Sequence, residues 1–157
     1  MREDVMKRIK TIVVFVFSLC LIASASFAQD WGTAAEAKAL LDKAVSLIKA
    51  EGEKAYPKIQ DKNGAFISKD LYVYVFEADG AIVKVHPYAP GMIGKSWKTL
   101  TDADGTPFVK KIIEGAAKSG KGTVDYSWAD PKTKKVEKKS AYYEKVGNVI
   151  AVSGYYK

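Results

Sequence analysis

Thiol and imidazole groups are scarce in this chain of 157 residues. Its one cysteine, Cys20, lies in an N-terminal segment that we expect to be removed, and its one histidine is His86. A domain without cysteine forms no disulfide, holds no metal through thiolates and has no cysteine nucleophile. One histidine without cysteines is also a weak ligand set for a metal. The sequence therefore predicts neither a metal site nor a cofactor.

Arginine is scarce as well, although the formal net charge of the chain is +7. Both arginines, Arg2 and Arg8, lie in the same N-terminal segment. Arginine makes the commonest specific contact to bases and the bidentate contact to phosphates. We therefore expect no nucleic-acid partner. The densest basic run, at 132–139, favours a solvated hairpin tip.

The N-terminal segment, 1–28, has the order of a secretory signal. Basic residues come first, the apolar run "TIVVFVFSLCLIA" follows, and small residues lead to Ala28. This run is shorter than the roughly 20 residues of a spanning helix. We expect cleavage after Ala28, which leaves 29–157 as one domain in the periplasm or outside the cell. The alternative is an uncleaved segment that holds the protein at the cell membrane; a lipid anchor is disfavoured because Leu19 precedes Cys20.

Helical signals begin at Thr33, which has the spacing of a capping box with Glu36. Apolar residues then recur every three or four positions, as in an amphipathic helix. They are Ala37, Leu40, Leu41, Ala44 and Ile48. Gly52 is a stop signal, and a shorter helical segment is predicted over 53–60.

The rest of the chain predicts strands and one more helix. Aromatic and β-branched residues and turn signals mark the strands. These lie near 70–77, 81–86, 122–129, 136–145 and 148–156. Thr106 as N-cap and Pro107 as first helical residue predict a helix that ends at Gly120. Because hairpins join antiparallel strands, we expect an α+β fold with the helices on one face of the sheet.

A longer pattern resembles a known family. The stretch "DLYVYVFEADGAIVKVHPYAPGMIGKSWKTLTDADGTPFVKKIIEGAAKSGKGTVDYSWADP", followed by "KKSAYYEKVGNVIAVSGYY", is similar to the single Cache domains of bacterial extracytoplasmic sensors. The shared features are a strand ending in Asp-Gly, then His-Pro, Gly-Lys, Asp-x-x-Gly, Tyr-x-Trp-x-x-Pro, Lys-x-x-Tyr and Ser-Gly-x-Tyr. Their order and spacing, from about Gly52 to the C-terminus, carry the resemblance.

This resemblance implies a PAS-like antiparallel sheet of about five strands, a long N-terminal helix, a second helix packed on the sheet, and a pocket between sheet and loop. It also implies a small organic ligand, often a short carboxylate. Most members sit on chemoreceptors or histidine kinases. This chain stops at Lys157, directly after the last predicted strand. We therefore expect a stand-alone domain that presents its ligand to a membrane receptor, kinase or transporter.

Two other classes of function compare with this one. An accessory or structural periplasmic subunit with a vestigial pocket and no ligand is the alternative. An enzyme is not expected, because the chain has no nucleophile elbow, phosphate loop or metal-ligand spacing.

The candidate ligand-binding residues fall first in the loop "HPYAPGMIGK". His86, Tyr88 and Lys95 lie there, and the prolines favour a tight, ordered path. An unperturbed imidazole has a pKa near ~6.5, so a donating His86 predicts binding that tightens between pH ~8 and ~6. The alternative is that His86 only pins the loop through a hydrogen bond.

Further candidates lie on the later strands. Tyr126 and Trp128 share one strand face, where they could serve the core, a ligand or both. Lys139 and Tyr142 are three positions apart, so a regular strand points them to opposite faces and only a bulge would bring both to one pocket. Lys139 could equally belong to the solvated basic run.

Overall fold

The computed structural model describes residues 31–157, and the predicted signal segment lies outside the described residues. Two helical stretches come first, α2 (Ala34–Glu51) and α3 (Tyr56–Gln60), joined by the 3-10 turn η1 (Gly52–Ala55). A third helix, α4, spans Phe108–Ser119, and a short 3-10 turn, η2, spans Pro90–Met92. Within the part of the chain that is described, no helix is long and apolar enough to cross a membrane.

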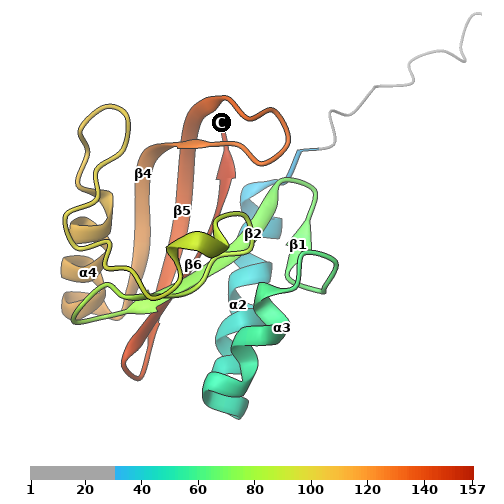
Figure 1. Cartoon of the computed structure of the whole chain (residues 1–157), viewed down its shortest axis with the longest axis vertical. Coiled ribbons are helices and arrows are strands. Elements are labelled where there is room, and N and C mark those ends of the chain that lie inside the picture. The colour runs from blue at the N-terminus through green and yellow to red at the C-terminus, as the bar shows by residue number, and fades with distance from the viewer. Residues whose placement is uncertain (1–30) are drawn as a thin grey trace, which may run out of the picture. The chain divides into compact units, whose positions relative to one another are not determined.

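Six antiparallel strands form one sheet, which confirms the predicted α+β fold (Figure 1). The strands are β1 (Ile67–Ser68), β2 (Leu71–Glu77), β3 (Val83–Val85), β4 (Lys121–Ala129), β5 (Val136–Val146) and β6 (Val149–Tyr156). Their order is β1-β2-β6-β5-β4, and β3 also pairs with β2. The last strand in sequence therefore lies in the middle of the sheet.

Helix α2 forms as the sequence predicts. Thr33 and Glu36 complete the capping box, and Gly52 ends the helix with a φ of 61°, a conformation that favours glycine. The predicted apolar stripe is buried against alternate residues of the central strands. We call this side of the sheet the helix face; Leu71, Val73, Val75, Val149 and Ala151 line it.

Helix α4 lies on the opposite side, so the expectation that the helices share one face is wrong. It packs beside β4, and Phe108 stacks on Tyr126 with ring centroids 4.2 Å apart (Figure 1). The start of α4 also differs from prediction. The N-cap position is Pro107 rather than Thr106, because Pro107 has a non-helical ψ of 64° and the helix begins only at Phe108.

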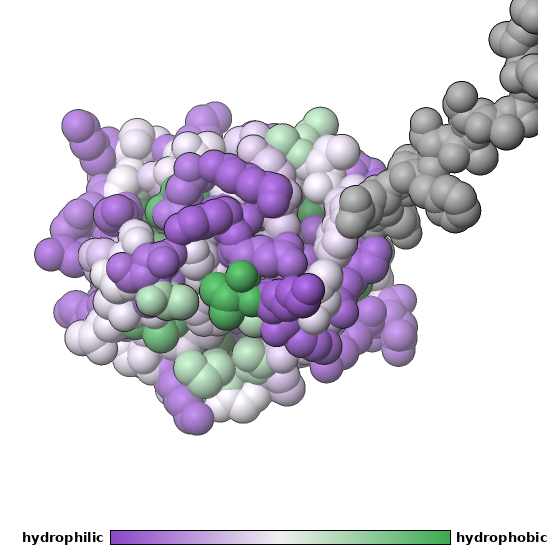
Figure 2. Space-filling model, turned by 90° about the horizontal axis from the view of Figure 1, so that it is seen from above, coloured by the Kyte–Doolittle hydropathy of each residue, from purple (hydrophilic) through white to green (hydrophobic). Residues whose placement is uncertain are grey.

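The side of the sheet that faces away from α2 is rich in aromatic residues, and we call it the aromatic face. Tyr72, Tyr74 and Phe76 alternate with the apolar residues that β2 turns to the helix face. The surface seen from above is mostly hydrophilic, with small separate apolar spots (Figure 2). The aromatic cluster is mainly internal, since Tyr72, Tyr74, Phe76 and Trp97 are at most 2% exposed.

Candidate functional site

Lys139 lies on the aromatic face, where it forms the outermost pair between β5 and β6. In the register of the sheet it is flanked by Tyr126 on β4 and Tyr156 on β6. Its side chain is almost completely buried, and its ammonium nitrogen lies 3.9 Å from the ring centre of Tyr72 and 4.7 Å from that of Tyr156. Among residues 31–157, this nitrogen has no hydrogen-bond partner.

Rings from the strands β2, β4 and β6 and from the loop after β3 lie around this lysine, and we call them the aromatic box. The box consists of Tyr72, Tyr74, Tyr88, Trp97, Tyr126, Trp128 and Tyr156, with His86 among them. Burial lowers the pKa of Lys139 to about 7, although nearby Asp70 and Asp130 favour its charged form. The amine therefore gains or loses its proton close to neutral pH. Burial disfavours its charged form because the ammonium loses its contact with water.

His86 is held in the box by its own loop and by α3. The Gln60 side chain accepts the His86 N–H at 2.8 Å and donates to the His86 carbonyl at 3.1 Å. The imidazole Nδ1 accepts the Ala89 N–H at 3.0 Å, so a neutral ring carries its proton on Nε2. The ring packs between Tyr72 and Trp97.

The electrostatics of His86 correct one expectation. Burial and then the charge of Lys139 lower the pKa of His86 to about 3. The imidazole is therefore neutral between pH 8 and 6 in the free domain, and the pH dependence predicted from an unperturbed imidazole does not apply to it. The loop-pin contact weighed as an alternative is present. Lys139 is the group with a pKa near neutrality.

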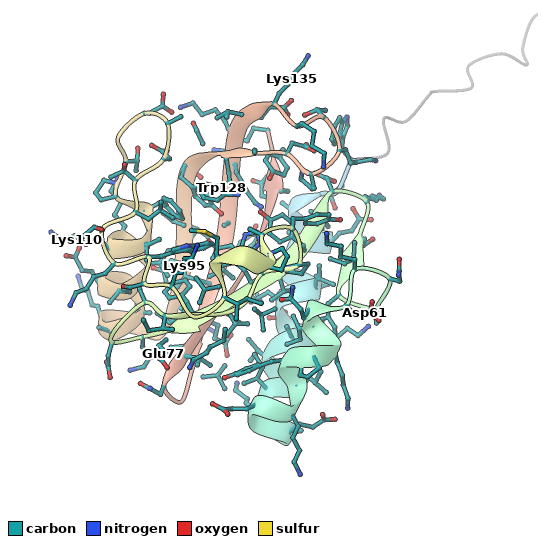
Figure 3. All side chains as sticks on the ribbon, viewed as in Figure 1. Asp61, Glu77, Lys95, Lys110, Trp128 and Lys135 are labelled. Atoms are coloured by element: carbon teal, nitrogen blue, oxygen red, sulfur yellow. The ribbon has the colours of Figure 1, made fainter. Side chains whose placement is uncertain are left out.

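Tyr126 and Trp128 serve the packing of this face and also bring polar tips to it. The Tyr126 hydroxyl shares a hydrogen bond of 3.2 Å with the Tyr74 hydroxyl, and burial raises the pKa of both groups. Trp128 is half-buried, with its ring centre 6.0 Å from that of Trp97. Its place on β4 is labelled in Figure 3.

Two buried carboxylates lie at the edge of the box. Asp70 directly precedes β2, and Asp130 directly follows β4. Both are fully buried, and both act on Lys139, Tyr88 and Tyr156. The site therefore combines one buried base with two buried acids inside an aromatic wall.

A comparison with protein families identifies the domain. The model of the family described as "Single Cache domain 2" matches residues 1–157. The chain belongs to this family. Cache domains are sensor domains. No curated protein matches the chain.

Solved structures agree with the Cache fold. A methyl-accepting chemotaxis protein from Vibrio parahaemolyticus RIMD 2210633 is 23% identical with a TM-score of 0.66, over 78% of this chain and 86% of that one. A periplasmic sensor domain of a chemotaxis protein is 20% identical with a TM-score of 0.66, over 85% and 99%. A Cache chemosensory domain, described as recognising carboxylic acid, is 20% identical with a TM-score of 0.60, over 99% and 98%. At these identities the likeness shows the fold.

Five of the seven predicted site residues lie together in or around the Cache domain's box. They are His86, Tyr88, Tyr126, Trp128 and Lys139. Tyr88 packs edge-on against Tyr72 with centroids 5.2 Å apart. The structure brings these residues to one place, and it leaves their contact with a ligand as a proposal.

The other two predicted residues lie elsewhere. Tyr142 packs on the helix face because β5 keeps a regular register through Lys139 and Tyr142, without the bulge that a shared pocket would need. Lys95 is exposed on the loop after η2, where its carbonyl accepts the Val83 N–H (Figure 3). Both assignments are therefore corrected.

Asp70, Asp130 and Trp97 were missed by the sequence reasoning. The two aspartates stand at strand ends and resemble ordinary turn residues, and Asp130 does accept the N–H groups of Lys132 and Thr133. The alternation of Tyr72 and Tyr74 with valines was a signal for a second, aromatic face. The same alternation places Asp70, two positions before Tyr72, on this aromatic face.

The Cache domain also has hollows on its surface. One of about 600 Å³ lies between α2 and the 61–66 loop, and another of about 520 Å³ lies beside α4. Neither is lined by a box residue. We place the candidate site at the box because buried polar atoms that lack partners are gathered there, which marks a place where a ligand would improve the bonding.

Proposed function

We propose that this Cache domain is an extracytoplasmic sensor domain that binds a short organic carboxylate inside the aromatic box. The observation that carries the proposal is the buried Lys139 ammonium, which no group in 31–157 hydrogen-bonds. A buried ammonium that lacks a hydrogen-bond acceptor is costly, and burial accordingly lowers the pKa of Lys139 to about 7. A ligand carboxylate would supply the missing acceptor.

The surrounding residues fit the rest of such a ligand. The faces of Tyr72 and Tyr156 already border the amine, and they would border a short aliphatic chain that replaces part of this contact. His86 is neutral, so its Nε2–H would donate to the carboxylate without a change of charge. The Tyr126 hydroxyl would be a second donor if it turned from Tyr74.

Binding should be linked to protonation of Lys139. A nearby anion raises the pKa of an amine. Above the free pKa of about 7, the domain must therefore take up a proton when the carboxylate binds, and affinity should fall by up to about tenfold per pH unit as the pH rises. Below pH 7 the lysine is already charged, and this dependence should disappear.

The family and the similar structures support a destination for the signal. The similar solved structures include a chemotaxis receptor and a periplasmic sensor domain, so we propose a location outside the cytoplasm and a membrane receptor, kinase or transporter as partner. The similar domain described as recognising carboxylic acid supports the choice of ligand class.

The test is a thermal-shift screen of two- to four-carbon carboxylates, followed by calorimetry. A ligand that binds only the folded state must raise its melting temperature. Lys139→Met should weaken binding by about 30-fold or more, since it removes one partner of a buried charge pair. Lys138→Met is the matched control, because Lys138 is exposed and pairs with Asp104. Equal affinity of wild type and a folded Lys139→Met variant would refute the proposed site.

A further inference from the structure

Four buried polar atoms on the aromatic face lack a hydrogen-bond partner within the described region. Two are donors, Lys139 Nζ and Trp97 Nε1, and two are acceptors, Asp70 Oδ2 and Asp130 Oδ2. All four side chains are at most 2% exposed. Native proteins hydrogen-bond the large majority of their buried polar atoms, so four exceptions around one site need an explanation.

In each aspartate, one carboxylate oxygen accepts hydrogen bonds from the backbone and the other has no partner within residues 31–157. Asp70 Oδ1 accepts the Gly32 N–H, and Asp130 Oδ1 accepts the N–H groups of Lys132 and Thr133. These bonds fix both carboxylates in place. Within residues 31–157, the second oxygen of each accepts no hydrogen bond.

The two carboxylates and the lysine share one neighbourhood. Lys139 pairs with Tyr156 across β5 and β6, and extension of the β2–β6 register places Asp70 beside Tyr156. The Tyr156 hydroxyl donates to the carbonyl of Ala129, the residue before Asp130. The negative charges of Asp70 and Asp130 both favour the charged form of Lys139.

An unsubstituted carboxylate would provide partners for only two of these four polar atoms, the two donors. It would accept from the two donors, Lys139 Nζ and Trp97 Nε1. It would also bring a third negative charge near the two buried acids, whose second oxygens would still have no donor within residues 31–157. A ligand that also carries an ammonium group would satisfy the acids and add no net charge. A hydroxyl has one hydrogen to donate, so it would satisfy one of the two acids and would not offset the charge of the carboxylate.

We infer that the box selects a short carboxylate that also carries a hydrogen-bond donor, with Asp70 and Asp130 as the acceptors of that donor. This inference rests on the proposed function and names the ligand class within it. The order of affinity that follows is amino acid first, hydroxy acid second and unsubstituted acid last. Asp70 and Asp130 act as specificity-determining residues.

The test compares five ligands of three carbons by calorimetry with the wild-type domain: propionate, lactate, 3-hydroxypropionate, alanine and β-alanine. At least one amino acid should bind about tenfold or more tightly than propionate, since its ammonium bonds to buried carboxylates. Asp70→Asn and Asp130→Asn, made separately, should reduce this advantage below about threefold while propionate binds as well as before or better. Asp125→Asn is the control, because Asp125 is exposed and bonded to Ser140 and Lys157.

The outcomes separate this inference from the proposed function. If wild type binds propionate as tightly as every donor-bearing ligand, the inference is wrong and the carboxylate site stands. If folded Asn variants lose all five ligands equally, the aspartates are structural and the inference is also wrong. If none of the five binds at about millimolar concentration, both proposals fail for ligands of this size. The order of the five affinities is measured on the wild-type domain, so it tests the inference even if a variant fails to fold.

Discussion

The two faces of the sheet are made by the same strands and have opposite chemistry. On the helix face, β2 presents Leu71, Val73 and Val75, and α2 covers them with an apolar stripe. On the aromatic face, the same strand presents Tyr72, Tyr74 and Phe76 next to a buried lysine. Because side chains alternate along a strand, one segment can serve two purposes without compromise.

The two faces therefore differ in what they contribute: the helix face contributes mainly stability, and the aromatic face carries the candidate binding site. Each fully buried aliphatic side chain on the helix face contributes about 1.5–3 kcal/mol. The aromatic face also buries large rings, but it includes four polar atoms whose partners are absent from residues 31–157. The helix face therefore stabilises a fold whose other face is free to keep groups suited to a ligand.

The largest effect on stability should come from the helix face. Leu41 is 1% exposed, and Leu41→Ala should lower the free energy of unfolding by about 2–5 kcal/mol. Urea denaturation measures this loss. Leu47→Ala, at a half-buried position of the same helix, should cost less. The affinity of the folded fraction for a carboxylate should not change; a large change would mean that the two faces are not independent.

The second effect concerns Lys139 and pH. The unfolded lysine keeps a pKa near ~10.5, whereas the folded one has a pKa of about 7. Between these values the unfolded chain binds the proton and the folded domain does not, so this lysine makes stability rise with pH by up to ~1.4 kcal/mol per unit.

Denaturation between pH about 7 and 9 should show this slope in wild type and not in Lys139→Met. Lys138→Met is the control and should keep the wild-type slope, since Lys138 is exposed. Parallel curves for wild type and Lys139→Met would show that the buried amine does not titrate in this range.

A smaller effect should follow from Tyr126→Phe. The hydroxyl is bonded to that of Tyr74 inside the box, so its loss should cost about 0.5–1.5 kcal/mol of stability. If it also donates to the ligand, affinity should fall by a similar amount. Tyr142→Phe, on the helix face, is the matched control and should leave affinity unchanged. Thermal unfolding and calorimetry measure the two quantities.

The smallest effect on the pH profile should come from His86. The ring stays neutral because burial and Lys139 hold its pKa at about 3. His86→Asn can keep an acceptor for the Ala89 N–H, whereas His86→Ala loses it and should cost about 1 kcal/mol of stability. In both variants the pH dependence of binding above pH 6 should match that of wild type. A flattened profile would assign the titrating group to the imidazole instead.

Much of the fold could be predicted because local signals are strong in this chain. The capping box at Thr33 and the alternation in "LYVYVF" each determine an element from neighbouring residues. The side of the sheet that α4 covers could not be predicted, because it depends on the path of the long connection between β3 and α4. The Tyr142 error was avoidable, since the three-residue spacing from Lys139 already placed the two on opposite faces of a regular strand.

The buried polar residues of the site, Lys139 and Asp130, were hard to predict from the sequence for a different reason. Lys139 sits in a lysine-rich run that looks solvated, and only its pairing with Tyr126 and Tyr156 places it inside. Asp130 looks like a turn residue and is one, while its second oxygen faces no donor within the described chain. Burial of this kind comes from strand register over long sequence separations, which composition and spacing do not encode.

The most direct test of the account is the number of protons taken up when a carboxylate binds. Calorimetry at about pH 8.5, in two buffers with different ionisation enthalpies, measures this number. Wild type should take up close to one proton per ligand, because Lys139 is mostly neutral before binding and charged afterwards. Lys139→Arg, which stays charged, should bind with no uptake. If wild type binds a carboxylate at this pH and takes up no proton, Lys139 is not the group that holds the ligand.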